Sequence, residues 1–118
     1  IISRRHENHV LYKEFLADKF YIQQCGPDSQ VCSISFGLIT KDTEQRRSIV
    51  KALVDNGIET RIFSAGNLGL HPFWFNRYGK KSFPVADKIH YCGWFLPNNP
   101  SLSAENIEFI SQVVLKAM

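Results

Sequence analysis

The sequence predicts an α+β fold, in which a small, mostly antiparallel sheet has helices packed on one face. Two observations predict it. Three segments have the apolar spacing of amphipathic helices, and four short segments among them have the composition of strands and are bounded by turns. With 118 residues, of which 44% are apolar, the chain has the size of one domain and can bury a single core.

The first helix is predicted over residues 3–19 and the first strand over residues 20–24, with a turn at residues 26–29 before the second strand at residues 31–40. In the second strand every other residue is apolar, which predicts one buried face. The residues of that face are Cys32, Ile34, Phe36 and Leu38. The first helix takes its apolar stripe from Val10, Leu11 and Phe15.

The second helix has the clearest signals. Asp42 or the threonine after it can cap the first turn, and Gln45 stands three residues beyond Asp42, as in a capping box. Gly57 occupies the position at which a left-handed residue commonly ends a helix, and the strand predicted next, over residues 58–63, carries Arg61. The predicted apolar stripe of this helix consists of Ile49, Val50, Leu53 and Val54.

Residues 64–84 form a long irregular segment that is rich in glycine, aromatic and basic residues, and such segments are usually functional or poorly ordered. Its aromatic residues have two interpretations: they pack a short helix onto the core, or they contact a neighbouring domain or subunit. These residues are Phe73, Trp74, Phe75 and Tyr78. A short helix over residues 85–91, a strand over residues 93–96 and a last helix from Ser103 complete the domain.

The composition argues against several classes of protein. A net charge of +3 with scattered basic pairs gives little ground for a nucleic-acid partner, and no apolar run reaches the roughly 20 residues of a membrane span. Three cysteines without a CxxC spacing favour free, buried thiols in a reducing, cytoplasmic compartment over a disulfide framework. His6 and His9 lack a third metal ligand, so no metal site is expected.

No complete catalytic constellation is present, so the candidate site residues are binding residues. Arg61 precedes the irregular segment, where its guanidinium can present donors to a phosphate or carboxylate. It can also form a structural salt bridge with Glu59 or Asp87. Asn67 can orient a sugar hydroxyl or stabilise a turn. His71 can contact a ligand or cap the next helix.

Several short motifs, in order along nearly the whole chain, resemble one enzyme family. They are Arg4-Arg5 followed by Asn8 and Tyr12, Gly57-Ile58-Glu59-Thr60-Arg61, Ala65-Gly66-Asn67-Leu68, His71-Pro72, Pro84-Val85-Ala86-Asp87, Asn98-Asn99-Pro100 and Leu102-Ser103-Ala104-Glu105-Asn106-Ile107. The ordered set resembles the C-terminal part of the DegT–DnrJ–StrS family of sugar-nucleotide aminotransferases, which are pyridoxal-phosphate enzymes of the aspartate-aminotransferase fold. The resemblance implies that residues 1–118 form the single, small C-terminal domain of a longer enzyme, whose large cofactor-binding domain is absent from this sequence.

Within that family the Ala-Gly-Asn segment is most similar to 3-dehydrases that act on 4-keto-6-deoxyhexose nucleotides in lipopolysaccharide (O-antigen) biosynthesis. His71 stands where those enzymes more often have glutamine, and aminotransferases of the perosamine-synthase type share other pieces. The resemblance therefore implies a dehydrase, with an aminotransferase as the alternative. It also implies that Arg61, Asn67 and His71 line the substrate side of a cleft between the two domains.

The resemblance further implies the cofactor and the partners. The parent enzyme is expected to be a homodimer that uses pyridoxal 5'-phosphate or pyridoxamine 5'-phosphate and binds a nucleotide-linked deoxyhexose. No lysine here has the family's Schiff-base context, so the 118 residues alone are expected to be inactive and to bind no pyridoxal phosphate. Two other classes stay open from the residues alone: a free-standing α+β ligand-binding module and a weak nucleic-acid binder.

Overall fold

The computed structural model describes all residues from 1 to 118. The helices are α1 (Ile2–Leu16), α2 (Thr43–Asp55), α3 (Pro72–Tyr78), α4 (Pro84–Cys92) and α5 (Ala104–Lys116), with a 3-10 turn η1 (Leu68–Leu70) before α3. The strands are β1 (Tyr21–Ile22), β2 (Ser35–Ile39), β3 (Arg61–Ile62) and β4 (Gly93–Pro97). None of the helices combines the length and the apolar character that crossing a membrane requires.

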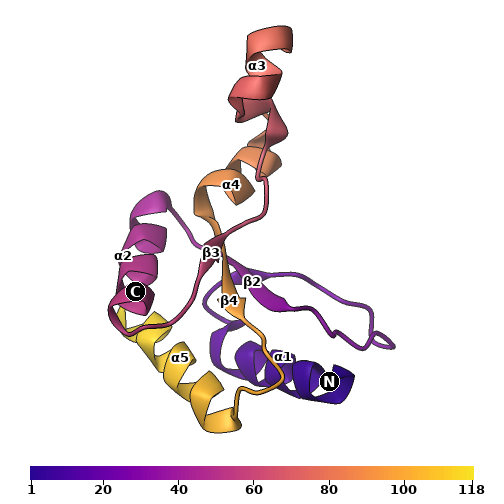
Figure 1. The fold of residues 1–118 in the computed structure, drawn as a ribbon, viewed down its shortest axis with the longest axis vertical. Coiled ribbons are helices and arrows are strands. Elements are labelled where there is room, and N and C mark those ends of the chain that lie inside the picture. Colours follow the sequence, from indigo (N-terminus) through magenta and orange to yellow (C-terminus); the bar gives the residue numbers. More distant parts are fainter.

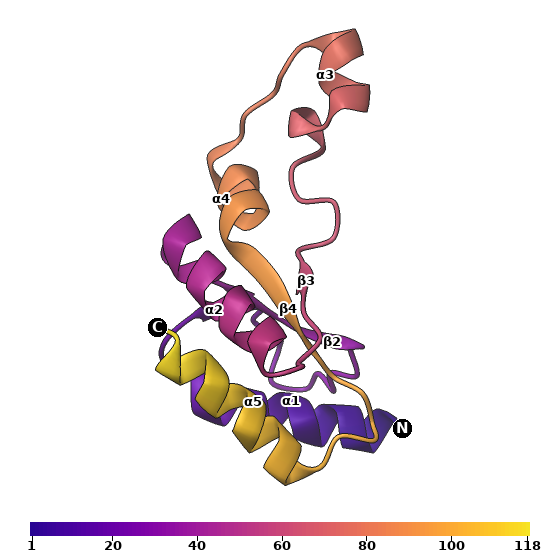
Figure 2. The ribbon, with the colours of Figure 1, turned by 60° about the vertical axis from the view of Figure 1, so that its left-hand side comes forward.

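The four strands form one antiparallel sheet in the order β1-β2-β4-β3. Helices α1, α2 and α5 lie together against one side of this sheet (Figures 1 and 2). We call the sheet and these three helices the body. The predicted α+β fold is therefore confirmed.

The pairing between β2 and β4 decides which side chains enter the core. Phe36 lies opposite Leu96 and Leu38 lies opposite Trp94, so these four side chains point to the same, helix-covered face. Each of them is at most 1% exposed. The opposite face, which we call the open face, carries the alternate residues Ser35, Gly37, Ile39, Phe95 and Pro97 together with Arg61.

The helices complete the core with aromatic and aliphatic side chains. Tyr12 of α1 stacks on Phe36 with ring centroids 4.9 Å apart, and its hydroxyl donates a 2.9 Å hydrogen bond to the carbonyl oxygen of Pro97. Burial raises the pKa of the Tyr12 phenol. Leu53 of α2 and Ile107 of α5 are fully buried on the same side of the sheet. The body therefore holds the strands in one fixed register.

Helix α2 begins and ends as the sequence predicts. Asp42 is its N-cap residue, and the Oδ1 atom of Asp42 accepts a 2.8 Å hydrogen bond from the main-chain N–H of Gln45. Gly57 has a φ of +70°, the left-handed conformation expected after a helix. The apolar stripe is narrower than predicted, because Val54 is 62% exposed while Leu53 beside it is fully buried.

Strand β2 is shorter than predicted. It starts at Ser35 rather than at residue 31, because its pairing with β4 ends where Ser35 lies opposite Pro97. Before that point no strand partner covers the chain, so Ile34 is 73% exposed and Cys32 is exposed as well. The apolar alternation thus produces a buried face only within the paired strand.

The prediction of buried thiols is wrong for two of the three cysteines. Cys25 and Cys32 lie exposed in the connection between β1 and β2, and only Cys92, at the end of α4, is buried. Two other bounds also differ from the prediction. Helix α1 ends at Leu16, and β3 comprises only two residues rather than the whole of residues 58–63.

Residues 72–83, which we call the arm, project from the body beyond α4 and carry α3 at the far end of the molecule (Figures 1 and 2). No residue of α3 is buried, and Phe73 and Tyr78 are 65% and 57% exposed. The interpretation that these aromatic residues pack onto the core is therefore wrong. Their contact with a neighbouring domain or subunit stays a prediction.

Candidate functional site

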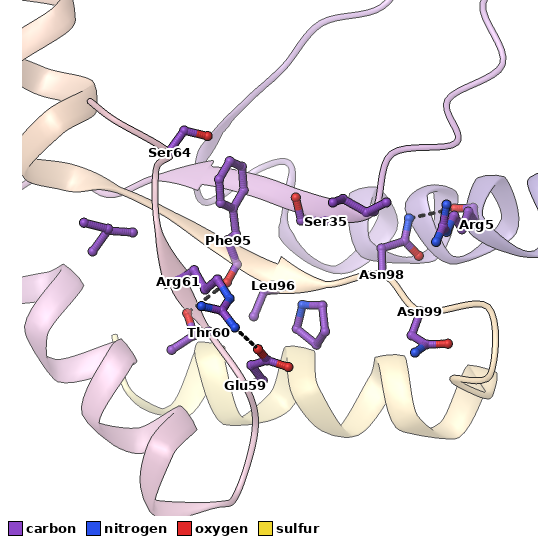
Figure 3. Close-up of a pocket in the computed structure, with 13 residues that line it drawn as sticks. Arg5, Ser35, Glu59, Thr60, Arg61, Ser64, Phe95, Leu96, Asn98 and Asn99 are labelled. Carbon is purple, nitrogen blue, oxygen red and sulfur yellow. Dashed lines mark hydrogen bonds and ion pairs between the residues drawn. The ribbon is translucent and has the colours of Figure 1, made fainter. Parts of the chain in front are cut away.

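A pocket of about 620 Å³ lies on the open face, where β3, β4 and the start of β2 come together (Figure 3). Its charged side chains are Arg5 of α1, Glu59 and Arg61. Its other polar side chains are Ser35, Thr60, Ser64, Asn98 and Asn99. Two guanidinium groups among hydroxyls and amides suit a ligand that carries both an anionic group and hydroxyl groups.

Arg61 belongs to this pocket because of the register between β3 and β4. It lies opposite Phe95, whose side chain points to the open face. Nη2 of Arg61 lies 2.7 Å from Oε1 of Glu59, and both side chains are largely exposed (Figure 3). Arg61 thus pairs with Glu59 and not with Asp87. Exposed pairs of this kind contribute only about 0.2–1 kcal/mol, so an anionic ligand can displace Glu59 at little cost.

Asn67 shapes residues 64–71, which follow β3 and which we call the loop. The residue is 5% exposed, and its Oδ1 atom accepts a 2.9 Å hydrogen bond from the N–H of Gly69. Its Nδ2 atom donates to the carbonyl oxygen of Lys81 at 3.1 Å and to Oδ1 of Asp87 at 2.5 Å. The side chain therefore stabilises a turn and ties the loop to the arm and to α4. A direct contact with a sugar hydroxyl stays a prediction.

His71 is the last residue of the loop and the N-cap residue of α3, but its side chain makes no capping hydrogen bond. Its Nε2 atom lies 2.5 Å from the carbonyl oxygen of Ala65. Its ring meets the ring of His90 edge to face, with centroids 5.7 Å apart. These contacts close the loop on itself, and the contact of His71 with a ligand stays a prediction.

Helix α4 supplies partners that the sequence analysis missed. The carboxylate of Asp87 accepts hydrogen bonds from the side chains of Ser82 and Asn67, and these two bonds, Ser82 first, lower the pKa of Asp87. Nδ1 of His90 accepts a 3.1 Å hydrogen bond from the main-chain N–H of Asn67. The spacing of an aspartate and a histidine three residues apart on a predicted helix is a signal that could have paired them. Arg5 belongs to a motif of the family resemblance, but no spacing in the sequence predicts that it reaches the open-face pocket.

The structure does not place the three predicted residues in one pocket. Arg61 lines the open-face pocket with Ser64, whereas Asn67 and His71 lie farther along the loop, next to α4. A ligand that touches all three must therefore extend from the sheet to the base of the arm. The structure also brings together no group of three or more histidine, cysteine, aspartate or glutamate residues that could hold a metal ion.

The fold and the site define a class of domain, namely a helix-backed antiparallel sheet whose opposite face presents an arginine and a glycine-containing loop. Comparison with known proteins identifies the family to which this domain belongs. Residues 1–115 match the DegT/DnrJ/EryC1/StrS aminotransferase family. The chain belongs to this family.

The chain is similar over nearly its whole length to enzymes that are much longer. It is 27% identical over 114 residues to the GDP-perosamine synthase of Escherichia coli O157:H7, a match that spans 96% of this chain and 30% of that protein. The crystal structure of a DegT DnrJ EryC1 StrS aminotransferase from Brucella abortus shares 19% identity and a TM-score of 0.81, covering 98% of this chain and 30% of that one.

A third similar protein is the E. coli GDP-4-keto-6-deoxy-D-mannose-3-dehydratase, whose structure contains bound hydrated pyridoxal phosphate. It shares 21% identity and a TM-score of 0.79, over 96% of this chain and 30% of that one. At these identities the likeness to the solved structures establishes the fold. The chain spans about 30% of the length of the relatives that it matches.

Proposed function

We propose that residues 1–118 are the C-terminal small domain of a longer enzyme that uses pyridoxal or pyridoxamine phosphate and acts on a nucleotide-linked deoxyhexose. The observation that carries the proposal is the exposed guanidinium of Arg61 at the open-face pocket, on the side of the sheet that α1, α2 and α5 leave free. Most of the length of each relative has no counterpart in this chain, and a large domain built from that part can form the other wall of a cleft.

The three predicted residues have different roles in this proposal. Arg61 is bonded through one of its N–H groups to Glu59, and its planar fork suits a phosphate of the nucleotide. Asn67 holds the shape of the loop through its three side-chain hydrogen bonds. His71 is half-buried and ends the loop at the base of the arm, where a sugar can reach its ring.

The reaction that we propose is removal of the C3 hydroxyl from a 4-keto-6-deoxyhexose nucleotide, in lipopolysaccharide (O-antigen) biosynthesis. The Ala65-Gly66-Asn67 segment and the likeness to the E. coli 3-dehydratase support this choice. A sugar-nucleotide aminotransferase is the second candidate. The 27% identity to a GDP-perosamine synthase and the presence of His71 before Pro72 favour it.

The residues of this chain do not fit pyridoxal phosphate on their own. A Schiff base needs a lysine amine beside the cofactor, but every lysine here is exposed and none lines the open-face pocket. The only carboxylate of that pocket, Glu59, is paired with Arg61. We therefore propose that the large domain supplies the cofactor site, and that the isolated chain is inactive and binds no cofactor. A visible absorbance band that survives removal of excess pyridoxal phosphate would contradict this.

The same proposal makes the parent enzyme a cytoplasmic homodimer, with neither a membrane nor a nucleic acid as partner. The exposed aromatic residues of α3 then contact the large domain or the second subunit. Phe73→Ala in the longer protein, measured by gel filtration, is expected to weaken the dimer or leave the arm undocked. A Phe73→Ala variant whose dimer is unchanged and whose arm is as resistant to proteolysis as that of the unaltered longer protein would contradict the docking.

Titration of GDP-mannose into the 15N-labelled chain tests the substrate-binding proposal. Half of a cleft is expected to bind weakly, with a dissociation constant on the order of 1 mM. The chemical-shift changes are expected to lie in residues 59–71 and to disappear in Arg61→Ala. Arg77→Ala, which removes an arginine from α3, is the matched control and should titrate like the wild type. Shift changes that avoid residues 59–71, or an Arg61→Ala variant that binds as well as the wild type, would overturn the proposal.

A further inference from the structure

Two residues of α4, Asp87 and His90, lie one helical turn apart and both hold Asn67. Nδ1 of His90 accepts the 3.1 Å hydrogen bond from the main-chain N–H of Asn67, and Oδ1 of Asp87 accepts the 2.5 Å bond from its side-chain amide. Asp87 is fixed in turn by the hydroxyl of Ser82. One helix therefore binds both the backbone and the side chain of a single loop residue.

The main chain of the loop lies directly against the ring of His90. Gly66 has a φ of +58°, and a Cβ atom at this position would stand 2.3 Å from Nδ1 of His90. Glycine alone accepts both this backbone conformation and this close approach. The ring of His71 also meets the His90 ring edge to face. His90 thus contacts the loop at Gly66, Asn67 and His71.

The end of α4 that carries His90 is fixed to the body rather than to the arm. Nη1 of Arg46, on α2, donates hydrogen bonds to the carbonyl oxygens of His90 and Gly93 at 3.1 and 3.3 Å. Gly93 is the first residue of β4, the central strand beside β2 and β3. The main chain that carries the His90 side chain is therefore held by the body.

We infer that His90, with Asp87, is a positioning residue that fixes the loop and thereby the orientation of His71. The role of the loop on the substrate side rests on the proposed function, whereas the anchoring can be measured without any ligand. The hydrogen bond to Nδ1 also determines the tautomer of the neutral His90 ring. A nitrogen that accepts a hydrogen bond carries no hydrogen, so the neutral ring of His90 has its hydrogen on Nε2.

The first test is a spectroscopic one on the unaltered chain. Two-bond 15N–1H spectra of the imidazole at neutral pH are expected to show His90 with an unprotonated Nδ1 and a protonated Nε2. The main-chain amide of Asn67 is expected to exchange with solvent more slowly than the exposed amides of the arm. A His90 ring with its hydrogen on Nδ1, or an Asn67 amide that exchanges as fast as the arm, would overturn the anchoring.

The second test uses two variants that separate the hydrogen bond from the bulk of the ring. His90→Asn keeps an acceptor oxygen near the position of Nδ1, whereas His90→Phe keeps a ring and has no acceptor. Exchange of the Asn67 amide is expected to be about threefold to tenfold faster in His90→Phe than in His90→Asn, as for the loss of one hydrogen bond. Equal exchange in the two variants would contradict the inference. The indole N–H resonance of the fully buried Trp94 reports whether each variant is folded.

GDP-mannose titration of the same variants separates this inference from the proposed function. If the wild type binds, His90→Phe is expected to bind more weakly than His90→Asn, because its loop is no longer held. Equal binding by both variants would end the positioning role, even with the anchoring intact. A wild type that does not bind contradicts the proposed function. The spectra and the exchange rates still test the anchoring of the loop in that case.

Discussion

The body buries its apolar side chains, whereas the arm leaves its apolar side chains exposed. In the body, strands β2 and β4 place alternate residues in a core where Trp94, Leu38 and Leu96 are at most 1% exposed. In the arm, α3 has no buried residue and presents Phe73 and Tyr78 to solvent. Both regions are rich in apolar residues, yet only the body uses them for its own stability.

In this fold the residues that stabilise the domain are separate from the apolar residues that are available for binding. Apolar side chains that a domain leaves exposed contribute little to its own folding and are available to another surface. The loop lies between the two regions and is held by hydrogen bonds to α4 rather than by apolar packing. We therefore expect substitutions in the body, the loop and the arm to have clearly different effects.

The largest expected effect comes from the same substitution made in the body and in the loop beside the arm. Leu53 of α2 is a fully buried core residue, so Leu53→Ala should lower the free energy of unfolding by about 2–5 kcal/mol. Leu68, in the short turn η1 beside the arm, is 49% exposed. Leu68→Ala should therefore change the free energy of unfolding by about 0.5 kcal/mol or less. Urea unfolding of both variants measures the difference, and equal losses would contradict the contrast between the regions.

A smaller effect is expected for two glycines that both have a positive φ, a range that alanine rarely adopts. Gly66 and Gly79 both have positive φ, but only Gly66 has a neighbour, His90, within reach of a Cβ. Either change to alanine costs about 1–3 kcal/mol through the backbone, and Gly66→Ala also displaces the His90 ring. Amide exchange of the loop should therefore accelerate in Gly66→Ala and stay unchanged in Gly79→Ala. The same acceleration in both variants would contradict the close contact.

The cap of α2 has a more modest effect. Asp42→Ala leaves the N–H of Gln45 without its side-chain acceptor and should lower the free energy of unfolding by about 1 kcal/mol. Asp28→Ala, in the exposed connection between β1 and β2, is the control and should have almost no effect. If both aspartates cost the same in urea unfolding, the lost charge and not the cap would be the cause.

The smallest effect concerns pH. Burial, and then the charges of Lys13 and His6, lowers the pKa of His9, whose ring packs edge-on against Phe36. The unfolded chain then binds more protons than the folded one as the pH falls below the usual range of histidine. Stability is thus complete above that range and decreases as the pH falls through it, until the folded His9 also takes up a proton. Urea midpoints between about pH 7.5 and 5 should depend less on pH in His9→Asn than in the wild type.

The sequence predicts the body well and the site only in part. Asp42, Gly57 and the alternation around Phe36 and Leu38 are local signals, and the structure realises each of them. The ends of a strand depend on its partner strand and not on local sequence alone. Strand β2 starts only where β4 pairs with it, and Ile34, which precedes that point, is therefore exposed despite its apolar character.

The site depends even more on contacts between distant residues. The exposed position of Arg61 follows from its pairing with β4, and the pairing of Asn67 with His90 joins a loop to a helix that begins well after it. No spacing within either segment contains that information. Motif resemblance drew attention to Arg61, Asn67 and His71 as single residues. The structure alone shows that Arg61 lies apart from the other two and that α4 holds the loop.

The coding sequence immediately upstream of Ile1 tests the central proposal most directly. We predict an open reading frame that continues upstream and encodes a segment more than twice as long as this chain, as in the relatives. That segment should contain a pyridoxal-phosphate site, with lysine at the Schiff-base position for an aminotransferase or histidine for a dehydrase. A start codon that directly precedes Ile1, or an upstream segment without such a site, would contradict the account.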